Sequence, residues 1–329
     1  VRSSGGVHTF AVASSGGFAF LPGSVDRPYL EYDAGGVLRD TVRVDGTWTL
    51  GVRPRGAGPP FVAVAGTSVG VWLYDMDSDR ATRLLMRDSV AAGGVGFGAF
   101  WPVFSSDGSR ILYTLTSATE CRIMERNLAT EVERVVQKTA SAAFFLLCPA
   151  SIDWSYDGRY VLVRRDSSLR IEPVDGAGQS REIVRPGRIW EGRFSPDGRS
   201  IAYSSDETGR AEVYIQSLSA GTPVRVSVDG GRWPAWSHRG SRLSFLTPNG
   251  RVQQVEIGSG AAGTPRTLFS VPTWRRSMFD DRGTGFAVVG DGERYIMRQS
   301  PSGVAVAFMS DWTSLLRRAE SGSAAAIRE

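Results

Sequence analysis

The chain has 329 residues, of which 41% are hydrophobic and 22% charged, and this balance excludes a disordered chain, a collagen-like chain and a small disulfide scaffold. Its 38 basic and 34 acidic residues give a formal net charge of +4. The basic residues are scattered arginines, with Lys138 as the one lysine. Because a nucleic-acid interface needs a clustered basic face, the sequence predicts no nucleic-acid partner.

The sequence also predicts no membrane segment. Its longest apolar run, from Ala142 to Cys148, is far shorter than the roughly 20 residues that cross a bilayer. The first residues, Val1 to Gly6, include neither an initiator methionine nor the apolar core of a signal peptide. We therefore expect a further part of the protein upstream of Val1, and the localisation stays unknown from these features.

A short turn motif recurs along the chain: an aromatic residue, a serine, a variable residue, an aspartate and a glycine, followed by an apolar strand. The best copy runs from Phe194 to Gly198 and leads into Ile201 to Tyr203. The full set of repeat glycines is Gly16, Gly58, Gly108, Gly158, Gly198, Gly240 and Gly283. They lie 42, 50, 50, 40, 42 and 43 residues apart. The mean of about 44 falls in the range of four-stranded propeller blades.

The elements follow in a regular order within each repeat. A Ser-Pro-Asp-Gly sequence favours a type I turn closed by a glycine in the left-handed region, so each copy predicts a hairpin. After the six glycines from Gly58 onward, the predicted strands lie at 61–64, 111–113, 161–163, 201–203, 243–245 and 286–288. In the best-defined repeat, two more strands follow at 212–216 and 223–227.

Four strands per repeat and almost no amphipathic helix predict an all-β propeller of four-stranded antiparallel blades. We expect seven blades within residues 1–310, or six if the first module belongs to a propeller upstream. Residues 311–318 predict a short C-terminal helix with Asp311 as its N-cap, followed by a flexible tail to residue 329.

Several stretches resemble the TolB-like propellers, and most of all the C-terminal propeller region of many bacterial serine/threonine protein kinases. They are 17–23, 153–159, 194–214, 229–236 and 304–313. The resemblance covers nearly the whole chain and implies a protein-binding or sensing propeller in a signalling protein, with a periplasmic location slightly favoured over a cytoplasmic one. His238-Arg239 and Asp281-Arg282 depart from the usual Pro-Asp of the turn.

No catalytic motif is convincing in this chain. The Gly-rich loop, strand lysine, His-Arg-Asp and Asp-Phe-Gly of a kinase are all missing. Gly66 to Gly70 fits a hydrolase Gly-x-Ser-x-Gly, but it joins two strands, and the chain has only two histidines. Asp75 to Asp79 resembles the start of a calcium loop but lacks its later glycine and glutamate. Gly93 to Gly98 precedes no helix that could bind phosphate. The sequence therefore predicts no metal, no cofactor and no enzyme activity.

Two cysteines, Cys121 and Cys148, could meet on one face of the propeller if each blade runs from its inner to its outer strand. Two buried thiols are the default interpretation, and a disulfide between them is possible in an oxidising compartment.

The candidate binding residues are tryptophans and arginines near the start of each inner strand. They are Trp48, Trp101, Arg188, Trp190, Arg232, Trp233, Trp274 and Arg275, with Arg53, Arg193 and Arg276 nearby. Aromatic and arginine side chains dominate interface hot spots, and arginine suits carboxylates. They predict that one face of the central channel binds an acidic protein or peptide. The alternative is that the tryptophans wedge between blades and the arginines cap them.

Three functions remain open. The first is a non-catalytic binding or sensing propeller of a kinase-type signalling protein, acting as a monomer. The second is a free TolB-like periplasmic interaction protein. The third is a propeller hydrolase or lyase, which would need carboxylates converging in a pocket.

Overall fold

The computed structural model describes residues 9–12, 18–21, 29–42, 49–53, 61–66, 70–75, 78, 80–85, 98–116, 120–140, 150–165, 167–183, 185–219, 221–258, 262–271, 285–290, 292, 294–298 and 307–309. The chain divides into two compact units. The larger unit runs from Arg27 to Ser300, and the smaller one combines Val1–Asp26 with Pro301–Glu329.

Five four-stranded sheets of the larger unit are each built from consecutive strands. They are β5 (Thr49–Val52), β6 (Phe61–Gly66), β7 (Gly70–Asp75) and β8 (Arg80–Leu85); β9 (Gly98–Phe104), β10 (Arg110–Thr116), β11 (Glu120–Asn127) and β12 (Glu133–Ala140); β13 (Ala150–Trp154), β14 (Tyr160–Arg165), β15 (Ser168–Pro173) and β16 (Arg181–Ile183); β17 (Ile189–Phe194), β18 (Ser200–Ser205), β19 (Glu212–Ser217) and β20 (Val224–Arg225); and β21 (Arg232–Trp236), β22 (Arg242–Leu246), β23 (Arg251–Glu256) and β24 (Arg266–Ser270). All neighbouring strands pair antiparallel, which confirms the predicted blade type.

One further four-stranded sheet joins the two ends of the larger unit. Its order is β25 (Phe286–Val289), β26 (Arg294–Arg298), β3 (Tyr29–Asp33) and β4 (Leu38–Val42). The junction pairs Tyr295 with Tyr32 and Met297 with Leu30. The strands β3 and β4, which come first in the larger unit, thus form the outer half of a sheet whose inner half consists of the last two strands of that unit, β25 and β26.

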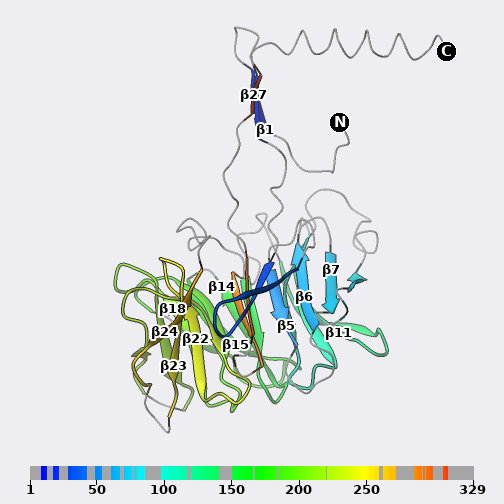
Figure 1. The fold of residues 1–329 in the computed structure, drawn as a ribbon. Helices are drawn as coiled ribbons and strands as arrows, with labels where there is room; N and C mark the ends of the chain where they lie inside the picture. Colours follow the sequence, from blue (N-terminus) through cyan, green and yellow to red (C-terminus); the bar gives the residue numbers. More distant parts are fainter. Residues whose placement is uncertain are drawn as a thin grey trace, which may run out of the picture. The chain divides into compact units, whose positions relative to one another are not determined.

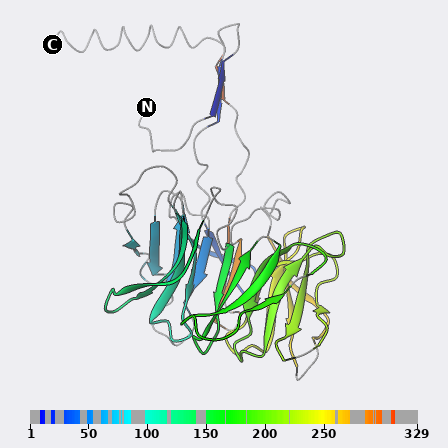
Figure 2. The same cartoon turned by 180° about the vertical axis from the view of Figure 1, so that it is seen from behind.

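Apolar side chains fill the space between neighbouring sheets. Six hydrophobic clusters of described residues each join two adjacent sheets around the ring. One contains Val71, Phe104 and Ile111 from the sheets that begin with β5 and β9. Another contains Tyr74 and Val289, so the sheet begun by β25 also contacts the sheet begun by β5. The sheets therefore surround a central axis with their first strands innermost (Figures 1 and 2).

The smaller unit contains a three-stranded sheet, in which β1 (Thr9–Val12) pairs with β2 (Phe18–Leu21), and β2 with β27 (Ala307–Met309). The hairpin expected at Gly16 therefore belongs to this sheet and does not form a propeller blade.

The predicted seven-bladed ring is wrong for two reasons. First, the module expected as blade one, β1 and β2, pairs with β27 of the same chain. The six-bladed alternative assigned this module to a propeller upstream, so the same pairing shows that this alternative is wrong as well. In addition, residues 286–288, expected as a second strand after Gly283, lie in the innermost strand β25, and the next hairpin runs through Gly290 and Gly292.

Gly283 lies outside the described residues, as does the predicted helix at 311–318, and the described residues contain no helix. Hence none of them offers a membrane-spanning helix.

The repeat turns form as predicted at Gly108, Gly158, Gly198 and Gly240, where φ lies between 65° and 74°. In the Gly198 turn, the Ser195 hydroxyl donates to Asp197 Oδ1 at 2.5 Å and accepts the Ser200 N–H at 2.9 Å. The Gly198 N–H donates to the Ser195 carbonyl at 2.9 Å. Serine and aspartate therefore satisfy the turn's backbone groups, which explains their recurrence.

Candidate functional site

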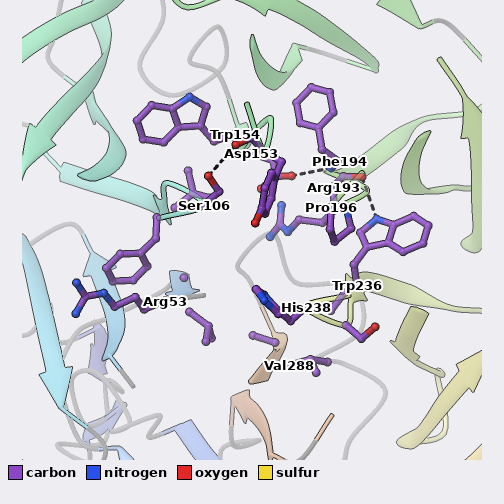
Figure 3. A pocket seen from close by; sticks show the side chains of 18 of the residues that line it. Arg53, Ser106, Asp153, Trp154, Arg193, Phe194, Pro196, Trp236, His238 and Val288 are labelled. Carbon is purple, nitrogen blue, oxygen red and sulfur yellow. Dashed lines mark hydrogen bonds between the residues drawn. The ribbon is translucent and has the colours of Figure 1, made fainter. Parts of the chain in front are cut away.

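A cavity of about 220 Å³ lies on the axis, lined by the inner strands of all six sheets of the larger unit (Figure 3). It reaches the end of the channel where the inner strands finish and the repeat turns begin. We call this end the turn mouth; its residues are Arg53, Ser106, Tyr156, Pro196, His238 and Gly290.

Polar contacts join neighbouring sheets at the turn mouth. They are Arg53 Nε to the Gly108 carbonyl at 3.1 Å, Ser106 Oγ to the Tyr156 carbonyl at 2.7 Å, the Phe194 N–H to Asp153 Oδ2 at 2.7 Å, Trp236 Nε1 to the Arg193 carbonyl at 3.3 Å, and the His238 N–H to the Gly290 carbonyl at 3.1 Å. Each crosses from one sheet to the next. The rim of the cavity is therefore preorganised, which lowers the entropy lost when a ligand binds.

Close backbone packing also shapes the cavity. A Cβ on Gly51 of β5 would lie 2.1 Å from the carbonyl oxygen of Pro102 in β9. Only glycine lets these two inner strands approach so closely.

The cavity holds a mixed set of charges. Asp153 of β13, Arg193 of β17 and His238 after β21 line it, and Figure 3 shows the Arg193 and His238 side chains directed toward its middle. Burial raises the pKa of Asp153 to about 6, against the attraction of Arg193 and the hydrogen bond from Phe194. Arg193 donates to its neighbour's carbonyl, that of Gly192, at 2.9 Å. Within the described part of the chain, the His238 imidazole has no hydrogen-bond partner. Arg193 and His238 are therefore available to an oxygen-bearing ligand.

Two of the candidate residues, Arg232 and Trp233, are buried; Arg232 contacts Glu191 of β17, and the Trp233 ring packs in the cluster between the sheets that begin with β21 and β25. Arg232 Nη2 lies 2.9 Å from Glu191 Oε2, and the guanidinium carbon is 4.5 Å and 4.7 Å from the ring centroids of Trp190 and Trp233. Glu191 also accepts the Trp233 N–H at 2.7 Å and the Ser204 hydroxyl. Burial opposes ionisation of Glu191, but attraction to Arg232 and these hydrogen bonds outweigh it and lower its pKa. We call Glu191, Arg232, Trp190 and Trp233 the Arg232 cluster.

The remaining candidates lie apart or outside the described residues. Arg188 is exposed and lies 4.9 Å over the Trp190 ring. Trp101 is half-buried in β9. Like Trp233, it precedes a proline and has a positive φ, 50° against 52°. Trp48, Trp274 and Arg275 lie outside the described residues. The structure thus brings Arg188, Trp190, Arg232 and Trp233 together, and their role in binding stays a prediction.

Cys121 of β11 is buried and disulfide-bonded. The chain's other cysteine, Cys148, lies outside the described residues. Their pairing therefore stays a prediction.

Sequence reasoning missed most of the turn mouth. Asp153 precedes the aromatic residue of its repeat, and Tyr156 and His238 occupy the variable position between serine and the fourth turn residue. The signal was available: a position that varies inside an otherwise fixed turn is free to serve a ligand. Among the described residues, no group of three or more His, Cys, Asp or Glu side chains could hold a metal ion.

Comparisons with known proteins agree with this architecture. No protein family profile matches the chain. A segment of 108 residues, 32% of the chain, is 31% identical to the Tol-Pal system protein TolB of Methylococcus capsulatus. A segment of 123 residues is 30% identical to the Tol-Pal system protein TolB of Bordetella pertussis. These matches span only about a quarter of the relatives' length, 24% and 27%. A solved structure described as TolB from Agrobacterium tumefaciens superposes on 84% of the chain and 99% of its own, with a TM-score of 0.60 and 16% identity.

The chain is therefore a β-propeller with four-stranded blades. More narrowly, part of its sequence is similar to TolB proteins and its fold to that of the solved TolB structure, a resemblance that the sequence predicted, whereas these comparisons do not show an association with kinases.

Proposed function

We propose that this chain is a non-catalytic TolB-like interaction propeller that binds a segment of a partner protein at the turn mouth. The cavity carries the proposal: all six inner strands line it, contacts between sheets hold its rim, and Arg193 and His238 are directed into it (Figure 3). Rigid scaffolds with recognition at strand ends and loops suit this task.

The proposed compartment is periplasmic. The disulfide at Cys121 fits an oxidising environment, and the relatives are named as proteins of the Tol-Pal system. The resemblance to TolB-like propellers also favours a periplasmic location.

A hydrolase or lyase is the weaker reading. Glycoside hydrolysis uses a pair of carboxylates, and Asp153 is the one carboxylate among the described residues that line the cavity. Its oxygen Oδ2 already accepts the Phe194 N–H. The carboxylate is therefore better placed to hold two sheets together than to accept a substrate proton.

The proposal is tested by selecting a phage-displayed library of random 12-residue peptides on the whole immobilised chain. The affinities of enriched peptides are then measured by fluorescence anisotropy. His238→Trp fills the cavity, whereas Arg239→Trp changes the next, exposed residue outside the cavity. We expect His238→Trp to weaken binding at least about tenfold and Arg239→Trp to leave it within about twofold. Equal affinities for both variants would overturn the proposal, as would a library that yields no binder.

A further inference from the structure

A second cavity, of about 470 Å³, lies between the sheet of β13–β16 and the sheet of β17–β20. One wall comes from the β13–β14 turn, Ile171, Gln179 and Arg181, and the other from the β17–β18 turn and Leu218. We call this cavity the inter-sheet groove. An Arg181 guanidinium N–H donates to the Leu218 carbonyl, which joins the two walls.

The groove adjoins the turn mouth. Tyr156, Phe194 and Pro196 line both cavities. Tyr156 is 50% exposed, which is unusual for a large aromatic side chain. A chain segment that enters the channel would therefore reach the groove by passing over Tyr156 and Pro196.

The channel end has the chemistry of a carboxylate receptor. Arg193 and His238 supply basic groups directed toward its middle, Arg53 lies at its rim, and Asp153 is the opposing charge among the described lining residues. Asp153 Oδ2 is already engaged by the Phe194 N–H. Arginine forms strong, geometrically specific hydrogen bonds to carboxylates.

The groove end is different. Tyr160, Ile171 and Leu218 give it an apolar floor, while Gln179 and Arg181 stand exposed at its edge. Its acidic residues serve the turns: Asp197 Oδ1, for example, accepts the Ser195 hydroxyl at 2.5 Å and the Arg199 N–H at 3.0 Å. The groove therefore suits an apolar side chain, with polar edge groups that can bond to a peptide backbone.

We propose that the partner segment is an extended acidic peptide. It places a carboxylate between Arg193 and His238 and an apolar side chain in the inter-sheet groove, and this proposal rests on the proposed function. The residues that line both cavities and the charge complementarity at the channel end together define this path. This path runs through one of the six spaces between neighbouring sheets. Although the blades are similar, a bound peptide would therefore leave the channel in one direction.

The experiment uses peptides enriched from the library on the whole chain. We expect Asp or Glu together with Trp, Phe, Leu or Ile in those peptides. Arg193→Gln removes the charge in the channel, with Arg199→Gln as its control on the same hairpin outside both cavities. Gln179→Trp fills the groove, and Ala177→Trp changes an exposed residue of the same loop that does not line it.

Arg193→Gln and Gln179→Trp are each expected to weaken binding at least about tenfold, and both controls to stay within about twofold. Circular dichroism and the urea midpoint of each variant show whether it is folded. If Arg193→Gln alone weakens binding, the groove path is wrong while the proposed function stands. If His238→Trp, Arg193→Gln and Gln179→Trp all leave binding unchanged, both proposals fail. If the enriched peptides contain no acidic residues, the proposal that a peptide carboxylate lies between Arg193 and His238 is wrong.

Discussion

Asp153 and Phe194 are joined across the boundary between two sheets, with Asp153 Oδ2 accepting the Phe194 N–H at 2.7 Å. The carboxylate is buried, and burial raises its pKa to about 6 from 3.8. The folded protein therefore holds this proton at pH values where the unfolded chain has lost it. Ionisation of Asp153 consequently destabilises the fold as the pH rises from about 4 to above 6.

The first prediction concerns Asp153→Asn, which removes this ionisation but keeps a side-chain oxygen for the Phe194 N–H. Because one pKa unit is worth about 1.4 kcal/mol, the free energy of unfolding of the variant relative to the original should rise by about 2 kcal/mol between pH 4.5 and 7.5. Urea denaturation at both pH values measures the change. A difference independent of pH would show that Asp153 ionises normally.

The second prediction concerns the Arg232 cluster. Arg232→Met leaves the buried carboxylate of Glu191 without its cation, and breaking a buried ion pair in this way costs about 3–5 kcal/mol. We expect a loss of that size in the free energy of unfolding, measured by urea denaturation.

A matched double variant separates charge from packing. Glu191→Gln combined with Arg232→Met removes the unpaired charge while a glutamine oxygen can still accept the Trp233 N–H, a bond of 2.7 Å in the structure. The double variant should therefore be more stable than Arg232→Met alone. If it is not, lost packing of Arg232 between the two indole rings dominates.

The third prediction concerns the repeat turn at Gly198, which has φ of 68° and nothing within 4 Å of an added Cβ. Gly198→Ala therefore tests backbone strain without a steric clash, and we expect it to lower the free energy of unfolding by about 1–2 kcal/mol. Gly198→Asn should cost less, since asparagine tolerates this conformation better. Equal losses for both variants would indicate that the turn has changed conformation.

The fourth prediction is that Cys121 pairs with Cys148. Peptide mapping without reductant should identify a fragment linked through these two residues. Reduction should lower the free energy of unfolding by about 3 kcal/mol, because the bond restricts the unfolded chain. A Cys121→Ser, Cys148→Ser variant should match the reduced protein and be insensitive to reductant. Recovery of unlinked cysteine peptides would refute the pairing.

The four-stranded blades could be predicted because the Ser-x-Asp-Gly turn is a local structure. Its serine, aspartate and glycine satisfy neighbouring backbone groups, so the motif marks a hairpin wherever it occurs, as at Gly108 and Gly198. The number of blades in the ring could not be predicted from this motif. At Gly290 and Gly292 the turn has lost its serine, and the pairing of β26 with β3 joins residues more than 260 positions apart, such as Met297 and Leu30.

The binding site was harder to predict than the fold. Tryptophan and arginine side chains drew attention to Arg232 and Trp233, but these are 2% and 4% exposed and contact Glu191 between two sheets. The residues that open onto the cavity, such as Tyr156 and His238, occupy the variable position of the turn, which the sequence marks as variable without showing that it faces a cavity. Only the arrangement of all six inner strands brings them together.

The sheet of β25, β26, β3 and β4 affects how the protein can be made. During synthesis β3 and β4 emerge early, yet the strand that pairs with β3 ends at Arg298. Until then, the edge of β3 that later pairs with β26 is exposed, and such an edge can pair wrongly with another chain. Ring closure is therefore a late folding event with a long loop to close. A nascent chain released before Arg298 would be an open arc of blades and a target for chaperones or proteases.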